Sequence, residues 1–304
     1  VANQFHARAA ATVDELLRGD IEAVYIASPP AAHREQAIAC AKAGKHVLSE
    51  KPLGMTVADA EAMIGACRNA GVWLGVAFMM RFVAQHQAAL RIIREGRLGK
   101  PVFGRAQLSC WYPPIPGAWR QDPQTGGGGA LMDMGGHCMD LLEMFFGPVR
   151  AVSCFIGRTV HGYAAEDSAV ASLVFQNGAL GVVDTFFCVP DEASQNRLEL
   201  YGSMGSILAR NTLGQGAAGE MLACFGREAA GYDAQQSRAA SSGAVPINPV
   251  PVNPYRAEIE EFSQAILEDR EPAINADIGL QSQRVLSACY ESARSGRVVE
   301  LALA

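Results

Sequence analysis

The sequence has no uninterrupted apolar run near the roughly 20 residues that a membrane-spanning helix needs. It also lacks any cluster of lysine and arginine, and its formal net charge is −6. Because nucleic-acid binding depends on concentrated positive charge, we expect neither a membrane protein nor a nucleic-acid-binding protein. With 304 residues, of which 49% are hydrophobic and 18% charged, the chain is long enough for two domains with buried cores.

None of the eight cysteines forms a Cys-x-x-Cys pair, and several lie in apolar surroundings. Short cysteine spacings are typical of structural zinc sites, so no such site is expected. We interpret the cysteines as reduced thiols of the core, which favours a reducing compartment and a cytoplasmic location.

Residues 1–100 alternate short β-branched runs with helical patterns, which is typical of a parallel sheet with crossover helices. Strands are predicted at Ala23–Ala27, His46–Ser49 and Val72–Phe78, each followed by a helix. This α/β pattern predicts a domain built on a doubly wound parallel sheet.

Polar residues and prolines follow each of these strands. They are Ser28, Pro29 and Pro30 after the first strand, Glu50, Lys51 and Pro52 after the second, and Met80 and Arg81 after the third. Open parallel sheets bind their ligands at the carboxyl ends of the strands, so Ser28, Lys51 and Arg81 should line one crevice. A lysine in a loop is more often solvated, but the place of Lys51 beside Pro52 at a strand end favours a functional role.

From residue 101 the pattern changes to longer alternating segments, which predict a largely antiparallel open sheet with one covered face. We therefore place a domain boundary there, which gives an α/β domain over residues 1–100 and an α+β domain over residues 101–304. Residues 214–253 are rich in Gly, Ala, Ser, Gln and Pro, and we expect a long surface excursion without an assigned role. Two amphipathic helices are predicted at Tyr255–Leu267 and Asp277–Arg294.

A run of four glycines, residues 126–129, precedes a helical segment that carries Asp133, His137 and Asp140. At about 100° per residue these three side chains share one narrow stripe. A carboxylate that accepts a hydrogen bond from one imidazole nitrogen leaves the other nitrogen free to move a proton, so Asp133 and His137 are the predicted acid–base pair. We expect the glycines to allow close approach of the backbone to a ligand.

Two other interpretations of this segment remain open. A lone histidine on an apolar helix is more often a satisfied core residue, although Asp133 one turn before His137 favours catalysis. The spacing of Asp133, His137 and Asp140 would also allow a metal site, but no further His or Cys cluster completes it, and no metal is expected. Asp140 is the secondary member, expected to bond the backbone or a nearby arginine.

Glu50-Lys51-Pro52 after a parallel strand, followed by a glycine-rich run and Asp-x-x-x-His, resembles the Gfo/Idh/MocA oxidoreductases, the glucose-fructose oxidoreductase and inositol dehydrogenase family. The likeness covers nearly the whole chain. Further matches are Ala27 to Pro30 with His33, Arg81, Trp119-Arg120 and residues 291–296.

The resemblance implies an enzyme that uses NAD or NADP to oxidise a sugar or polyol hydroxyl, or to reduce the corresponding ketone. It implies that residues 1–100 are a partial dinucleotide-binding (Rossmann) domain and residues 101–304 a substrate and oligomerisation domain. It implies that Lys51 contacts the nicotinamide ribose and the reacting oxygen, that His137 exchanges the hydroxyl proton, and that Asp133 positions the imidazole or holds a substrate hydroxyl. It also implies a cis bond between Lys51 and Pro52, and a homodimer or homotetramer. The other cofactor contacts would be Ser28, Pro29, Pro30, His33, Glu50, Pro52, Met80 and Arg81, and the other substrate contacts Tyr112, Trp119 and Arg120.

One part of the family pattern is missing from this sequence. Family members begin with a strand, a Gly-x-Gly-x-x-Gly-type turn, a helix and a second strand that ends in the residue that reads the ribose 2′ position. None of these is present, so we expect a truncated reading of a longer protein, with a parallel sheet that lacks these strands. Without these residues NAD cannot be told from NADP, and weak cofactor binding is expected.

The same family pattern allows two other functions. Some relatives hydrolyse glycosides through transient oxidation with tightly held NAD. A non-catalytic protein that senses sugar or cofactor is the other alternative, which the missing glycine-rich turn favours and the set of Lys51, Asp133 and His137 disfavours.

Overall fold

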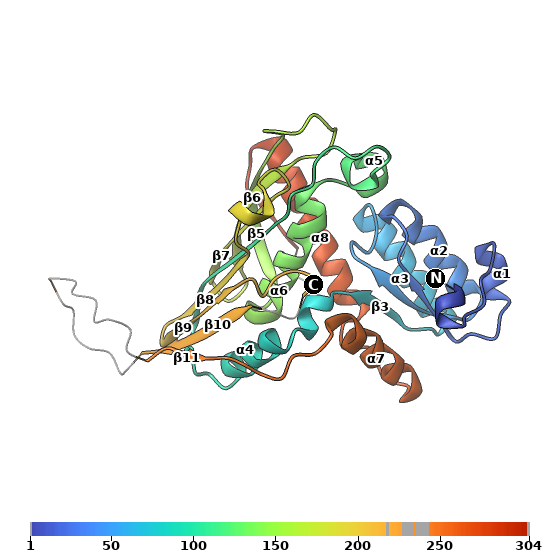
Figure 1. The fold of residues 1–304 in the computed structure, drawn as a ribbon, viewed down its shortest axis with the longest axis horizontal. Coiled ribbons are helices and arrows are strands. Elements are labelled where there is room, and N and C mark those ends of the chain that lie inside the picture. The colour runs from blue at the N-terminus through green and yellow to red at the C-terminus, as the bar shows by residue number, and fades with distance from the viewer. Residues whose placement is uncertain (1, 217–218, 227–233, 235–242, 303–304) are drawn as a thin grey trace.

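The computed structural model of the protein describes residues 2–216, 219–226, 234 and 243–302. Two sheets organise these residues, a three-stranded parallel sheet at one end and a nine-stranded mixed sheet at the other (Figure 1). The long helix α8 (Ala276–Ser295) runs between them and contacts strands of both. No helix in the described ranges combines the length and apolar character needed to cross a membrane.

The parallel sheet confirms the predicted series of strand and helix units. Its order is β1-β2-β3, and helices α2 and α3 pack beside it. Helix α3 begins with a capping box in which Thr56 and Asp59 bond reciprocally, and it ends at Gly71 in the left-handed conformation. The elements of this part are η1 (Ala2–Phe5), α1 (Val13–Leu17), β1 (Ala23–Ile26), η2 (Pro30–Ala32), α2 (His33–Lys42), β2 (His46–Glu50), α3 (Val57–Ala70), β3 (Leu74–Ala77), η3 (Met79–Phe82) and α4 (Ala84–Arg94).

The large sheet has the order β11-β10-β9-β8-β4-β7-β6-β5-β12, with every pair antiparallel except β4 and β7. Side chains along β6 and β7 alternate between buried and accessible positions, because helices cover only one face of the sheet. This confirms the predicted open, mainly antiparallel sheet. Its strands are β4 (Pro101–Ser109), β5 (Val149–Gly157), β6 (Ser168–Phe175), β7 (Leu180–Phe186), β8 (Arg197–Gly202), β9 (Gly205–Arg210), β10 (Glu220–Phe225), β11 (Val245–Pro246) and β12 (Val299–Glu300).

The segment predicted as a surface excursion contains a strand of this sheet. β10 pairs with β9, and its residues Met221 and Ala223 are buried while Leu222 is exposed. The prediction was wrong here because a single run of six residues, Glu220–Phe225, gives a weak sequence signal, and the strand is stabilised by its neighbour β9. Residues 217–218, 227–233 and 235–242 of the same segment lie outside the described residues.

The C-terminal helices complete the core of the parallel sheet. Phe262 on α7 (Pro254–Leu267) packs against Leu48 and Ala77, and the amide of Val76 donates to the carbonyl of Ile274 just before α8. Residues far apart in the sequence therefore close the interior of the first sheet.

Substitutions at two helical glycines, Gly279 and Gly65, can test this packing. A Cβ at Gly279 on α8 would overlap the side chain of Val76 on β3, whereas a Cβ at Gly65 on α3 would meet open space. We expect Gly279→Ala to lower the free energy of unfolding by about 1–3 kcal/mol through overpacking. The matched control Gly65→Ala should raise it by about 0.5–1 kcal/mol because alanine favours the helix. Denaturant titration of both variants measures these changes, and equal effects would contradict the tight contact.

Candidate active site

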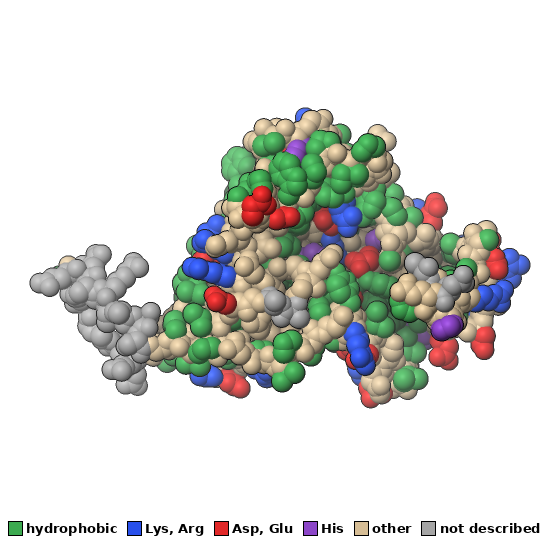
Figure 2. All heavy atoms as spheres, in the orientation of Figure 1, with side chains coloured by type: hydrophobic (Ala, Val, Ile, Leu, Met, Phe, Trp, Pro, Cys, Tyr) green, Lys and Arg blue, Asp and Glu red, His purple; other side chains and the backbone are tan. Residues whose placement is uncertain are grey.

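A cavity of about 650 Å³ lies where the carboxyl ends of β1 and β2 face the helical segment that contains His137. In the space-filling view, charged and histidine side chains gather in the hollow between the two halves of the molecule (Figure 2). The predicted residues that line the cavity are Ser28, Glu50, Lys51, Met80, Tyr112, Trp119, Arg120, Asp133 and His137.

Lys51 links the two halves across this cavity. It follows β2, and its Nζ donates to both the main-chain oxygen and Oδ1 of Asp133, at 2.7 Å each. The lysine side chain is only 9% exposed. Two of the three ammonium hydrogens are thus used, and the third can serve a ligand oxygen. The peptide bond between Lys51 and Pro52 is cis, as the family resemblance predicted.

Asp133 is held by two cations. Its second carboxylate oxygen accepts from Nε of Arg120 at 3.1 Å, while the first accepts from Lys51. Burial alone would raise the pKa of Asp133, but the charges of Lys51 and Arg120 outweigh burial and hold this pKa below its usual value. The guanidinium of Arg120 also stacks on Trp119, with its Cζ 4.1 Å from the ring centroid, so this face of the indole is covered by the protein itself. The carboxylate therefore stays ionised and organises the cavity wall.

The predicted hydrogen bond between Asp133 and His137 is not formed. Nδ1 of His137 is buried and, among the described residues, has no hydrogen-bond partner. The reason is local backbone geometry: residues Leu131–Gly135 form a π-helical turn, η5, before α6 (Gly136–Phe146) begins. The amide of Gly136 donates to the carbonyl of Leu131, and this wider turn changes the angular relation that α-helical spacing predicts.

The environment of His137 keeps its imidazole neutral. Burial lowers the pKa of His137 well below its usual value, and the positive charge of Lys51 lowers it further, while Asp133 partly opposes both effects. The ring of Phe78 packs edge-on against the imidazole, with 6.1 Å between the two ring centroids. A neutral imidazole at the cavity wall can accept a proton from a substrate hydroxyl.

Two glycines of the run, Gly128 and Gly129, pack against other parts of the protein, which corrects the prediction that the run approaches a ligand. A Cβ at Gly128 would overlap the hydroxyl of Tyr290, and a Cβ at Gly129 would overlap the carbonyl of Glu166. The glycines therefore allow the chain to pass against α8 and the loop before β6. Of the four, Gly127 also has a φ of +79°, a left-handed conformation that favours glycine.

Five residues predicted to contact the cofactor do not line the cavity: Pro29, Pro30, His33, Pro52 and Arg81. The buried ring of His33 lies between the carbonyl oxygens of Ser28, at 2.8 Å, and Pro52, at 2.9 Å. It therefore ties together the loops that follow β1 and β2.

Arg81 forms a bidentate ion pair with Asp140, whose side chain is 2% exposed. This confirms that Asp140 bonds a nearby arginine. Asp133 and Asp140 thus each neutralise cations of the protein, and the described residues contain no group of three side chains arranged to hold a metal ion.

Several cavity residues were missed from the sequence, among them Tyr255, Asn196 and Gln215. Tyr255 stands at the start of α7 and reaches the cavity because this helix packs on the parallel sheet. Oδ1 of Asn196 accepts from the amide of Ser109 at 3.0 Å and fixes the end of β4 at the cavity. Neither residue belongs to a local motif, so only the tertiary fold reveals them.

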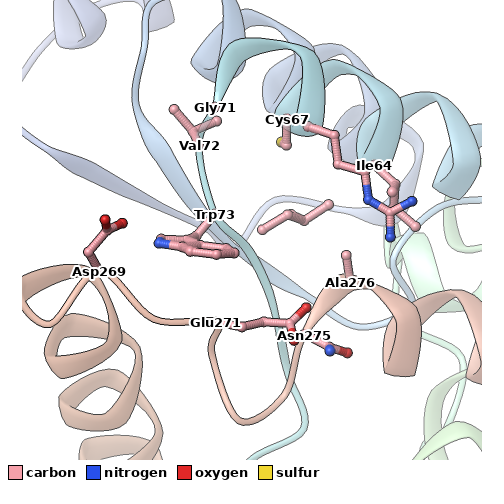
Figure 3. A pocket seen from close by; sticks show the side chains of 11 residues that line it. Ile64, Cys67, Gly71, Val72, Trp73, Asp269, Glu271, Asn275 and Ala276 are labelled. Carbon is pink, nitrogen blue, oxygen red and sulfur yellow. The ribbon is translucent and has the colours of Figure 1, made fainter.

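A second cavity of about 270 Å³ lies beside the amino end of β3 (Figure 3). The indole of Trp73 lines it, with Cys67 of α3 above and Glu271 below in this view. None of the predicted site residues lines it. This cavity marks the junction of α3, β3 and the start of α8.

A buried carboxyl group on α7 gives the protein a specific pH dependence. Glu258 is 2% exposed, and both of its oxygens lack hydrogen-bond partners among the described residues. Burial, together with the charges of Glu50 and Asp140, raises the pKa of Glu258 to about 9. The folded protein thus keeps a proton that the unfolded chain releases near pH 4.5, so this group lowers stability as the pH rises between these values.

We expect Glu258→Gln to remove this dependence. The difference in free energy of unfolding, variant minus wild type, should grow by up to about 1.4 kcal/mol per pH unit between pH 5 and 8. Urea titrations at several pH values measure it. Glu260→Gln, which removes a carboxylate from an exposed position on the same helix, is the matched control. A difference that stays constant with pH would show that Glu258 is ionised in the folded state.

Comparison with known proteins agrees with this geometry. A family model for the oxidoreductase family with an NAD-binding Rossmann fold matches residues 1–78, and a model for the GFO/IDH/MocA C-terminal domain matches residues 86–208. The 1,5-anhydro-D-fructose reductase of Ensifer adhaerens is 31% identical over 95% of this chain and 83% of its own length. The chain belongs to the Gfo/Idh/MocA oxidoreductase family.

Solved structures share this fold over nearly the whole chain. Aldose-aldose oxidoreductase from Caulobacter crescentus, in complex with glycerol, has a TM-score of 0.86 and 29% identity, and the match covers 99% of this chain and 87% of that one. The WlbA dehydrogenase of Bordetella pertussis, in complex with NADH and UDP-GlcNAcA, has a TM-score of 0.83 and 25% identity. That match covers 100% of this chain and 86% of the WlbA chain. The family and fold class predicted from the motifs are therefore confirmed.

Proposed function

We propose that this chain catalyses NAD(P)-dependent oxidation of a sugar or polyol hydroxyl, or reduction of the corresponding ketone. The observation that carries the proposal is the convergence of Lys51 and His137 on one cavity at the carboxyl end of the parallel sheet. Membership in a family of NAD(P)-dependent sugar oxidoreductases supports the reaction class.

The residues around the reacting oxygen divide the chemistry between them. The third ammonium hydrogen of Lys51 donates to the substrate oxygen and stabilises the negative charge that develops there. His137 accepts the hydroxyl proton in oxidation and returns a proton in reduction. Asp133 acts through Lys51, because it sets the direction in which the ammonium group points.

The residues at the sheet edge fit the nicotinamide end of the cofactor. Ser28 and Glu50 place a hydroxyl and a carboxylate at the carboxyl ends of β1 and β2, where ribose hydroxyls can be bonded, and Met80 adds an apolar surface for the ring. The bound nicotinamide supplies the acceptor or donor of hydride. The proposal includes both NAD and NADP, and it includes neutral sugars related to the substrates named for the relatives.

A substrate panel tests the proposed function. The purified protein is incubated with pyranoses, anhydrosugars and inositols in the presence of NAD⁺ or NADP⁺, and reduced cofactor is followed by absorbance. We expect steady formation of NADH or NADPH with at least one sugar. Glycoside cleavage without net reduced cofactor would instead indicate the hydrolase, and cofactor binding by calorimetry without any turnover would indicate the sensor.

A further inference from the structure

The π-helical turn that carries Asp133 is held by a carboxylate from another part of the chain. Oε1 of Glu166, in the loop before β6, accepts from the amides of Gly129 at 2.8 Å and Leu131 at 3.1 Å. The carbonyl of Glu166 also accepts from the amide of Ala130 at 3.1 Å. Since Ala130, the residue that begins this turn, offers no side-chain cap, Glu166 satisfies the free amides in its place.

A tyrosine from the long helix completes this arrangement. The hydroxyl of Tyr290 on α8 donates to the same Oε1 atom of Glu166 at 2.7 Å. Burial and the adjacent carboxylate raise the pKa of Tyr290 well above its usual value, so the hydroxyl keeps its proton and remains a donor. Glu166 is itself only 5% exposed, so the three hydrogen bonds are shielded from water.

The same residues explain why side chains are excluded at this point of the chain. Tyr290 and Glu166 occupy the space that side chains at Gly128 and Gly129 would need. The amide of Asp133 donates to the carbonyl of Gly129 at 3.0 Å, so the clamped glycine is directly bonded to the residue that receives Lys51. A continuous chain of hydrogen bonds thus leads from α8 to the ammonium group in the cavity.

We propose that Glu166 and Tyr290 are positioning residues of the active site: their shared hydrogen bond fixes the turn at Gly129, and thereby the Asp133 oxygens that orient Lys51. Neither residue lines the cavity, so neither touches substrate or cofactor. The inference rests on the proposed oxidoreductase function. Misplacement of a catalytic group by about 1 Å can cost up to about 10²-fold in rate, so loss of this clamp should lower turnover while leaving the ligand-binding surfaces intact.

Tyr290→Phe tests the proposal, because it removes one hydroxyl and keeps the ring. We expect kcat to fall about 10-fold to 100-fold with the KM for cofactor unchanged. Hydrogen exchange of the amides at residues 129–133 should accelerate in the same variant. Combined with Glu166→Gln, the loss in kcat should be smaller than the product of the two separate losses, since both act through one network.

Tyr201→Phe is the matched control. Tyr201 donates to the carboxylate of Glu199 at 3.2 Å on β8, so the variant loses the same kind of hydrogen bond outside the cavity. We expect its kcat and its exchange at residues 129–133 to equal those of the wild type. The proposal is overturned if Tyr290→Phe has the wild-type kcat and exchange, or if Tyr201→Phe matches its losses. If the wild type turns over no substrate, the proposed function fails, and the exchange measurement alone decides the role of the clamp.

Discussion

His137→Ala is expected to lower kcat about 10²-fold to 10⁴-fold, the usual loss when a general acid–base group is removed. The imidazole lies at the cavity wall, where burial and the charge of Lys51 keep it neutral. It is the only histidine among the described residues that line the cavity, so no second imidazole can replace it. Cofactor affinity should change little, because His137 belongs to the helical segment opposite the parallel strands. Steady-state kinetics and a calorimetric cofactor titration measure the two effects.

The pH dependence of the oxidation gives an independent check. Because the pKa of His137 is lowered well below its usual value, the base is already unprotonated at neutral pH. We therefore expect the rate to be constant through neutrality and to fall only in acid, and the variant should lose this acidic limb. His6→Asn, at an exposed position outside the cavity, is the control. Wild-type kcat in His137→Ala would remove the residue from the mechanism.

Lys51→Met is the second change with a large expected effect. Loss of a donor that stabilises developing negative charge costs about 10²-fold to 10³-fold in kcat. The variant also leaves the partly buried carboxylate of Asp133 with Arg120 as its only remaining partner in the ion-pair cluster. Breaking a fully buried pair from one side costs about 3–5 kcal/mol of stability. Asp133 is 20% exposed and keeps Arg120, so we expect a smaller loss and a lower melting temperature.

A double variant separates the two consequences. Lys51→Met combined with Asp133→Asn removes the carboxylate that has lost its lysine donor. Because the side chain of Arg120 is 36% exposed and its charge can stay solvated, we expect the melting temperature to recover in part while kcat stays low. Lys51→Arg keeps the charge but changes the direction of the donors, and should retain stability better than activity. Recovery of activity in the double variant would show that Lys51 serves the fold and not the reaction.

Much of the fold could be predicted from local sequence patterns. The alternation along Ser168–Phe175 predicted both a strand and its covered face, and the residues after His46–Ser49 predicted where Lys51 would lie. These signals are local because a strand or helix repeats its burial over neighbouring residues. The convergence of Lys51, Asp133 and His137 on one cavity was implied by the family resemblance, which rests on the spacing and order of two motifs.

Other features depend on contacts that no local pattern contains. The π-helical turn at Leu131–Gly135 cannot be read from periodicity, and it removed the predicted bond between Asp133 and His137. The glycines at 128 and 129 were visible, but their partners Tyr290 and Glu166 come from distant segments. Tyr255 likewise reaches the site only because α7 folds back onto the parallel sheet.

The packing of α7 and α8 also determines whether either half of the molecule can fold by itself. Phe262 and Ile274 belong to the interior of the first sheet, while α8 packs on β5 of the second, for example through Ser292. A cut near residue 100 would therefore give no autonomous folding unit, because the amino-terminal fragment would present bare hydrocarbon where these late residues belong. We therefore expect both sheets to unfold in one cooperative transition, because the same two helices bury apolar surface of each.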